Sequence, residues 1–446
     1  MPIDPRMRAQ TELILNTLDG AASFPQPERW DDADVDDVNY LYRKQTILAR
    51  EQDADRVAEA VGRILGDTGY GNVPEGDERA IRQEPVSGRI GVQRLTLPST
   101  PALVPEILDR LDEELGPGVG TPDHIYYVCP HPCPATEPFE VPPGTVDPFP
   151  LPGLNAHCCR SCRHIPWPGC DGDGVSVSIV DTGLVSGVAA DHPWLAGVQG
   201  DPEQGTYNSD GTIGPYAGHG TFAAGCVRCA APKASVYVGR GFSIDTAGAI
   251  FESDIAPSLD AALNRNPDIL VFTFCAASRR DLGLLTFDHF YERRIRYLKG
   301  LAVLAPAGND GHPRRMWPAA YREVISVGAL AADWRNRAHF SNYGKWVDVY
   351  APGEDLINAF PEGTYKTNEA PVQQTRQFNG MAKWSGTSFS TPLAAGLIAA
   401  RVSATGENAR QAADSLLRLA CNQAIPGVGA VLYPGQACCD TGGCRH

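Results

Sequence analysis

The sequence predicts an α/β protein whose main part is a doubly wound parallel sheet with helices on both faces, preceded by a small N-terminal α+β domain. Residues 173–434 alternate short apolar runs with helical patterns, which is typical of strands covered on both faces. Residues 1–128 alternate strand and helix patterns. Prolines and cysteines dominate residues 129–172, which predicts a linker, and residues 435–446 form a Cys-rich tail.

The N-terminal domain is predicted to hold three strands and two amphipathic helices. The strands are expected in "NYLYRKQTILAR", "RIGVQRLTLP" and "DHIYYV". Thr100 and Pro101 are expected to open the second helix. The apolar stripes of the two helices are Val57, Val61, Ile64 and Leu65, then Val104, Ile107, Leu108, Leu111 and Leu115.

The main domain contains five nearly continuous apolar runs that are expected to be buried strands. They are "VSVSIVDTG", "ASVYVG", "DILVFTF", "LAVLAPAGN" and "VISVGAL". Helices are expected in "IFESDIAPSLDAALNRN" and "RDLGLLTFDHFYERRIRYLKG", and Glu252 and Asp254 are interpreted as a solvated helix start. Ligands of such sheets bind beyond the carboxyl ends of the strands, so residues at those ends are the first candidates for a site.

Composition and charge narrow the classes of function. The 446-residue chain is 43% hydrophobic and 20% charged, which is typical of a globular protein. Its formal net charge of −15 argues against a nucleic-acid surface. The sequence shows neither a signal peptide nor an apolar stretch of membrane-spanning length, so we expect no membrane partner and a cytoplasmic location.

The 13 cysteines are mostly clustered, and their chemistry stays open. Disulfides or buried thiols are favoured over zinc, although His131, His157 and His164 near the first clusters keep zinc as an alternative. Four cysteines in apolar surroundings are interpreted as core residues: Cys226, Cys229, Cys275 and Cys421.

Four polar residues stand at the ends of apolar runs or at the starts of small-residue helices. Asp181 ends "VSVSIVD", His219 lies between two glycines in "GHGTFAAG", and Asn309 follows "LAVLAPAG". Ser388 lies in "SGTSFSTPLAAG". Taken singly, each could be a cap, a turn residue or a core residue.

Together these residues can perform nucleophilic catalysis. A serine hydroxyl needs an imidazole to take its proton, and the imidazole needs a carboxylate to fix its tautomer. The oxyanion that forms needs a preorganised donor, which the Asn309 amide can supply. The chain order Asp, His, Ser is also that of one known triad architecture.

The blocks "VDTGL", "GHGTFAAG", "APAGNDG" and "SGTSFSTPLAAG" resemble the signature blocks of subtilisin-like serine proteases (the subtilase, or S8 peptidase, family). Weaker matches follow in "WPAAYREVISVGA", "FSNYG" and "VDVYAPG", so the resemblance covers roughly residues 173–434. It implies a serine endopeptidase that cleaves protein or peptide substrates through an acyl-enzyme. It assigns Asp181, His219 and Ser388 to the triad, and Asn309 with the Ser388 backbone N–H to the oxyanion hole.

The resemblance is incomplete at the substrate-binding strand. The corresponding stretch is "FTFCAAS", in which Thr273, Phe274 and Cys275 replace a Ser-Leu-Gly-like sequence, so the family's specificity cannot be transferred. No cofactor is expected; structural calcium is common in the family, but no carboxylate cluster here indicates it. In element order the N-terminal domain resembles subtilase propeptides. It is therefore expected to be either an intramolecular inhibitor, released by cleavage within 129–172, or a permanent accessory domain.

Two other functions were considered. A second Asp-Thr-Gly at 440–442 could indicate an aspartic protease, but it lies among cysteines and follows no apolar strand. A subtilase-like fold that only binds peptides stays an alternative, although all catalytic positions are filled. Because an unrestrained protease would be hazardous in the cytoplasm, selective processing or regulatory proteolysis is the expected role.

Overall fold

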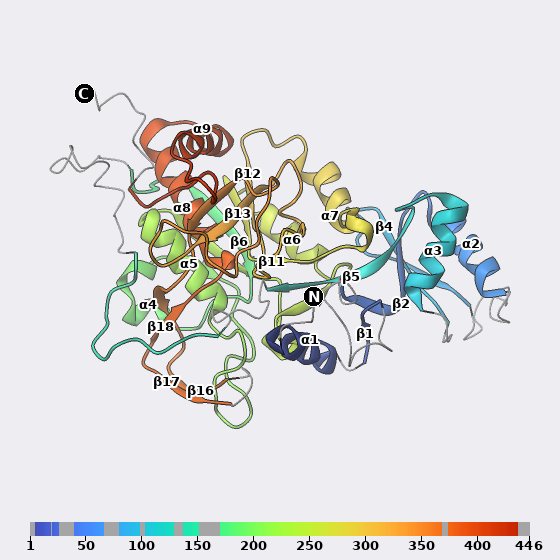
Figure 1. Ribbon diagram of the computed structural model, residues 1–446, viewed down its shortest axis with the longest axis horizontal. Coiled ribbons are helices and arrows are strands. Elements are labelled where there is room, and N and C mark those ends of the chain that lie inside the picture. Colours follow the sequence, from blue (N-terminus) through green and yellow to red (C-terminus); the bar gives the residue numbers. More distant parts are fainter. Residues whose placement is uncertain are drawn as a thin grey trace.

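The computed structural model describes residues 5–18, 20–25, 40–66, 80–98, 103–128, 137–150, 170–367 and 373–435. These residues form two regions that lie side by side (Figure 1). The larger region has a parallel sheet between helices, and the smaller N-terminal region has an antiparallel sheet. Strand β5 (Gly120–Val128) extends from the smaller region into the larger one (Figure 1).

The larger region is built on a seven-stranded sheet in the order β14-β13-β12-β10-β6-β8-β7, and every neighbouring pair is parallel. Residues alternate between the two faces, so Ile269 and Val271 point into one core, and Leu270 and Phe272 into the other. The strands are β6 (Ser176–Asp181), β7 (Gln199–Gly200), β8 (Ser235–Arg240), β10 (Ile269–Phe272), β12 (Ala302–Pro306), β13 (Ile325–Leu330) and β14 (Val349–Pro352).

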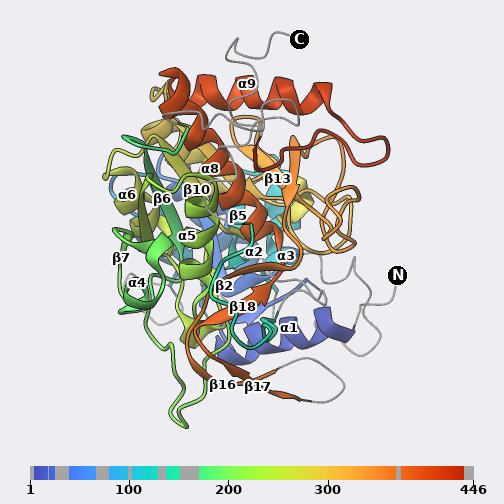
Figure 2. The same cartoon turned by 90° about the vertical axis from the view of Figure 1, so that its left-hand side faces the viewer.

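Helices cover both faces of this sheet, which confirms the predicted doubly wound architecture. Helices α5 (His219–Ala230) and α8 (Thr387–Thr405) pack on one face, where Figure 2 shows them in front of the strands. Helices α6 (Ala256–Leu263) and α7 (Leu285–Phe290) contribute to the core on the opposite face. Two further helices are α4 (Val188–Asp191) and α9 (Ala409–Asn422), and α9 packs on α8.

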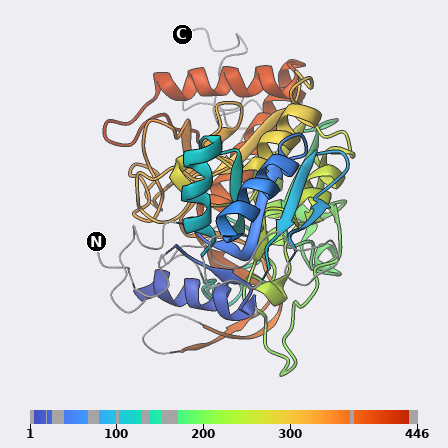
Figure 3. The same cartoon turned by 90° about the vertical axis from the view of Figure 1, so that its right-hand side faces the viewer.

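The N-terminal region is an antiparallel sheet in the order β3-β4-β2-β5 with two helices on its outer face (Figure 3). The predicted apolar stripes of these helices pack against strand residues such as Ile47 and Leu95. The opposite face of the sheet packs against the larger region, where Leu48 and Val92 share a core with Phe287. The elements are α1 (Pro5–Thr17), β1 (Ala22–Ser23), β2 (Tyr42–Arg50), α2 (Ala54–Gly66), β3 (Arg82–Pro85), β4 (Val92–Thr96) and α3 (Val104–Leu115).

Strand β5 joins the two regions through backbone pairing. One edge of β5 pairs antiparallel with β9 (Ala249–Phe251), and its end pairs antiparallel with β11 (Phe274–Cys275). Phe274 lies opposite Val128, and Cys275 lies opposite Tyr127. The last strand of the N-terminal region therefore fills the gap between two strands of the larger region.

Two small antiparallel sheets of two strands each complete the larger region, and part of the predicted linker lies on one of them. Within residues 137–150, Phe139 bridges to Lys383 and Phe149 to Ile357. The Arg376 guanidinium lies 4.0 Å from the centre of the Phe139 ring. These sheets pair β15 (Leu356–Ala359) with β18 (Met381–Trp384), and β16 (Gly363–Lys366) with β17 (Thr375–Phe378).

Three expectations about local structure were wrong. The predicted helix at 250–266 begins only at Ala256, because residues 249–251 form β9 and pair with β5. Glu252 is accordingly not a solvated helix start but is fully buried, and Asp254 pairs with Arg43 and Arg94 of the N-terminal region. Cys421 is not a core residue but is exposed near the end of α9.

Other expectations were met, or fall on residues that are not described. Cys226, Cys229 and Cys275 are buried, as expected of core residues. Helix α3 begins at Val104, and Thr100 and Pro101 lie outside the described residues. Cys170 is disulfide-bonded. The remaining clustered cysteines and the three histidines near them also lie outside the described residues. Within the described part of the chain, none of the helices has the length and apolar character needed to span a membrane.

Candidate active site

The local backbone around His219 requires the glycines on either side of it. Gly218 precedes α5 in the left-handed region with φ of 78°, and a Cβ there would lie 2.4 Å from Pro361 Cδ. A Cβ on Gly220 would lie 2.3 Å from the Gly183 carbonyl oxygen. Helix α5 can therefore approach the end of β6 closely, which brings His219 to Asp181.

The structure brings three of the predicted residues into one hydrogen-bonded chain. His219 Nδ1 lies 2.9 Å from both Asp181 carboxylate oxygens, and His219 Nε2 lies 3.0 Å from Ser388 Oγ. A carboxylate beside Nδ1 holds the proton on that nitrogen, so Nε2 is left to accept from the serine hydroxyl. The exposed fractions of Asp181, His219 and Ser388 are 0%, 3% and 1%.

Asn309 lies on the other side of Ser388. Its Oδ1 accepts hydrogen bonds from the Thr387 backbone N–H at 2.9 Å and from the Thr387 hydroxyl at 2.8 Å. These bonds fix the orientation of the carboxamide, whose Nδ2 is a donor. A Cβ placed on Gly386 would lie 3.1 Å from Ser388 Oγ and 3.6 Å from Asn309 Nδ2, so the hydroxyl and the amide border the same small space.

Aromatic side chains enclose the imidazole. The His219 ring lies 5.4 Å from Trp384 in an edge-to-face arrangement and 4.8 Å from Phe389. Phe222 and Phe360 extend this cluster around Trp384. Apolar walls exclude water and strengthen the electrostatic interaction between His219 and Asp181.

Glu203, which was not among the predicted site residues, links the two segments that carry Asp181 and His219. Glu203 accepts from the Gly218 backbone N–H at 2.9 Å and from the Thr182 hydroxyl at 2.8 Å. Thr182 in turn donates its backbone N–H to Asp181 Oδ1 at 2.6 Å. Burial raises the pKa of the Glu203 carboxyl to about 7, and the Asp181 charge adds to this rise. No periodic pattern or motif in the sequence indicates this role.

Thr273, Phe274 and Cys275 lie next to β5, which fills the gap between β9 and β11; we call this gap the cleft. Phe274 and Cys275 form β11 and pair with β5, whereas the Thr273 hydroxyl donates to the Val180 carbonyl oxygen at 3.0 Å. All three residues are buried. The backbone edge of β11 that an extended peptide would need is paired with β5 in this structure.

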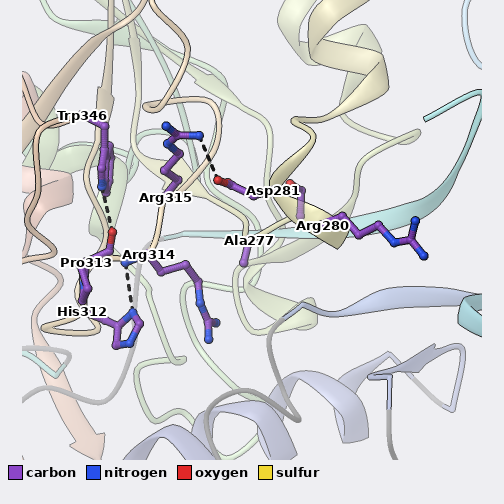
Figure 4. Close-up of a pocket in the computed structure, with 9 residues that line it drawn as sticks. Ala277, Arg280, Asp281, His312, Pro313, Arg314, Arg315 and Trp346 are labelled. Atoms are coloured by element: carbon purple, nitrogen blue, oxygen red, sulfur yellow. Dashed lines mark hydrogen bonds and ion pairs between the residues drawn. The ribbon is translucent and has the colours of Figure 1, made fainter. Parts of the chain in front are cut away.

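A pocket of about 510 Å³ opens where the chain leaves β11. Figure 4 shows Arg314 and His312 on one side of it and the Arg315–Asp281 ion pair, 3.0 Å long, on the other. Arg280 also borders the pocket, so its lining contains the guanidinium groups of Arg280, Arg314 and Arg315 but only the Asp281 carboxylate. The pocket contains neither Ser388 nor His219. Its charge favours acidic groups.

The residues present do not indicate a metal centre at this site. Within the described ranges, no group of three or more His, Cys, Asp or Glu side chains is arranged to hold a metal ion. The Asp181 carboxylate and the His219 imidazole are instead hydrogen-bonded to each other. The triad chemistry of these residues also needs no ion.

Comparisons with known proteins agree with this geometry. The model of the subtilase family matches residues 172–424. Thermitase from Thermoactinomyces vulgaris is 30% identical over 244 residues, which are 52% of this chain and 76% of that enzyme. Subtilisin BL from Lederbergia lenta is 30% identical over 248 residues, which are 52% of this chain and 77% of that enzyme.

The fold comparison reaches further along the chain. The crystal structure of fervidolysin from Fervidobacterium pennivorans, described as a keratinolytic enzyme related to subtilisin, superposes with a TM-score of 0.54 and 19% identity. The match covers 89% of this chain and 61% of the fervidolysin chain. At this identity the likeness concerns the fold alone.

Proposed function

The chain belongs to the subtilase family of serine endopeptidases, and we propose that it hydrolyses peptide bonds through Ser388, His219 and Asp181. The single observation that carries this assignment is the continuous chain of contacts from Asp181 through His219 to Ser388, with distances of 2.9 and 3.0 Å. These are hydrogen-bond distances between a nucleophile, a base and the group that orients the base.

In the proposed mechanism Ser388 Oγ attacks the peptide carbonyl carbon while its proton moves to His219 Nε2. The Asp181 carboxylate stabilises the imidazolium that forms. The carbonyl oxygen becomes an oxyanion that accepts hydrogen bonds from Asn309 Nδ2 and the Ser388 backbone N–H. His219 then donates its proton to the leaving amine, and the C–N bond breaks. A water molecule, deprotonated by His219, releases the acyl group from Ser388 in the same way.

The N-terminal region is proposed to act as an intramolecular inhibitor. Support comes from β5, which takes the position of an extended substrate by pairing with β9 and β11. Buried contacts hold it there, since Tyr126 is fully buried and packs edge-to-face on Phe274 at 4.9 Å. A protease whose cleft is closed by its own chain is suited to regulated proteolysis, such as the selective processing of one protein, rather than to general turnover.

A fluorophosphonate probe tests this proposal on the full-length protein. The wild type and the Ser388→Ala variant are labelled in parallel, and their intact masses are measured. Labelling of the wild type alone supports the reactive serine, and a mass loss that ends within 129–172 supports self-processing. A wild type that stays unlabelled after the N-terminal region has been removed would contradict the enzymatic function and favour a peptide-binding module.

A further inference from the structure

One residue of β5, His124, forms hydrogen bonds on both sides with the larger region, which is the protease domain. The His124 backbone oxygen accepts from the Glu252 N–H at 2.7 Å, and His124 Nδ1 lies 2.8 Å from Glu252 Oε2. On the other side, His124 Nε2 accepts from the Arg279 backbone N–H at 3.1 Å. Glu252 follows β9 and Arg279 lies beyond β11, so the imidazole spans the gap between the two strands that β5 separates.

Glu252 needs a partner in this position. Its side chain is fully buried, and its other oxygen accepts from the Thr286 backbone N–H at 2.7 Å. A buried carboxylate is costly unless it is paired and hydrogen-bonded. The charge of Glu252 also acts on the neighbouring Asp288 carboxyl. Burial raises the pKa of Asp288 to about 6, and the Glu252 charge contributes to that rise. When the chain in the cleft leaves, Glu252 loses the partner that His124 provides.

The two groups that contact the imidazole differ in their hydrogen-bonding roles: the Glu252 carboxylate accepts and the Arg279 backbone N–H donates. A ring nitrogen that accepts from the Arg279 N–H carries no proton, so Nδ1 carries it and donates to Glu252. In this arrangement the imidazole both donates and accepts. Like the imidazole, a carboxamide donates through one atom and accepts through another, whereas a hydroxyl must do both through a single oxygen, Lys and Arg only donate, and Phe does neither.

We infer that Glu252 and the Arg279 backbone N–H form a recognition site for an imidazole or carboxamide side chain on the peptide strand that occupies the cleft. The site lies at the middle of β5, four residues before Val128, which pairs with Phe274. It selects the chain's own β5 through His124, and it selects substrates that bind in the same register. The inference rests on the proposed peptide-cleaving function and adds a specificity determinant to it.

Hydrogen–deuterium exchange of the full-length protein tests the inference. All variants carry Ser388→Ala, so that self-cleavage cannot alter the chain. In His124→Phe, Glu252 and the Arg279 N–H lose their partners, and we expect the backbone amides of residues 120–128 and 249–253 to exchange about tenfold faster or more. In His124→Gln the carboxamide keeps both bonds, and we expect a change of less than about threefold. The exposed control Glu362→Gln should not change exchange at these residues.

A fold-disrupting effect is recognised by the amides of α2, which lie away from the cleft and should keep their protection. If His124→Phe loses protection there too, Glu252→Gln replaces it, since it leaves the N-terminal sequence intact and should also accelerate exchange at β5. The inference is overturned if His124→Phe or Glu252→Gln stays as protected as the parent, or if His124→Gln exchanges as fast as His124→Phe. A failure of the proposed function would appear elsewhere, as absent fluorophosphonate labelling of the chain that retains Ser388.

Discussion

The surroundings of Ser388 and the surroundings of Glu252 are organised in different ways. Around Ser388, the supporting contacts come from residues adjacent in sequence to the proposed triad. Thr182 donates to Asp181, Thr387 donates to Asn309, and Gly218, beside His219, donates to Glu203. Around Glu252 and Ser253, the buried polar groups of the larger region form hydrogen bonds with residues of the N-terminal region. Asp123, for example, accepts from the Ser253 N–H at 2.9 Å and from its hydroxyl at 2.8 Å.

The proposed triad is therefore preorganised, whereas the hydrogen bonding of the β9 edge depends on the chain that pairs with it. The contacts among Asp181, His219 and Ser388 involve no residue of the N-terminal region. The contacts of Glu252 and Ser253 do. We therefore expect departure of the N-terminal region to leave the triad in place and to leave unpaired polar groups along β9.

The largest effect is expected from His219→Ala. Without the imidazole, Ser388 loses the base 3.0 Å from its hydroxyl. Fluorophosphonate labelling should fall by about 10⁴-fold. The unfolding midpoint in urea should stay near that of the wild type, which serves as the control for folding. Labelling within tenfold of the wild type would remove His219 from the mechanism.

Asn309→Asp should lower peptide hydrolysis by about 10²–10³-fold. The aspartate keeps an oxygen for the Thr387 contacts at 2.8 and 2.9 Å, but it lacks the N–H that faces the oxyanion. The value of kcat/KM for one peptide, measured for both proteins, checks this. An unchanged kcat/KM would show that the oxyanion is stabilised elsewhere.

Glu203 should make the stability of the protein depend on pH. Because burial raises the pKa of its carboxyl from 4.5 to about 7, the folded state holds this proton more tightly than the unfolded state. Its contribution to the unfolding free energy is complete below pH 4.5 and should be lost, by about 3 kcal/mol, as the pH rises to 7. Urea unfolding of the wild type and of Glu203→Gln between pH 4.5 and 7.5 measures this slope. The same decline in the Gln variant would exclude Glu203 as its source.

The smallest effect is expected at the cationic pocket beside β11. Arg314→Ala should lower the hydrolysis of a peptide with acidic side chains relative to a neutral peptide by about threefold, because a partly exposed charge pair contributes little free energy. Arg296→Ala, at an exposed arginine outside the pocket, is the matched control. An equal loss of hydrolysis for both peptides would mean that the pocket does not discriminate between acidic and neutral side chains.

How much of this could be predicted from the sequence depends on the distance over which each contact acts. The Asp181, His219, Asn309 and Ser388 positions stand at strand ends and helix starts, so local patterns and a parallel sheet suffice to bring them together. Glu203 and Glu252 act through partners that no local pattern connects to them. Residues 249–251 form a strand only because β5 lies beside them, which explains why a helix was predicted there.

The compartment of the protein stays a prediction. The cytoplasm is the expected location, whereas a disulfide at Cys170 is of the kind that persists in oxidising compartments. The redox state of Cys170 in the purified native protein, measured by thiol alkylation and mass spectrometry, would favour one of the two.

The central claim is that β5 closes the peptide site of a reactive serine, and the labelling rate of Ser388 in Tyr126→Asp tests it most directly. Tyr126 is fully buried against Phe274, so a carboxylate there should expel β5 from the cleft. Tyr126→Phe is the control, because within the described residues the buried hydroxyl has no hydrogen-bond partner. The account predicts labelling at least about tenfold faster in Tyr126→Asp and no acceleration in Tyr126→Phe. A folded Tyr126→Asp protein that is labelled no faster than the wild type would contradict it.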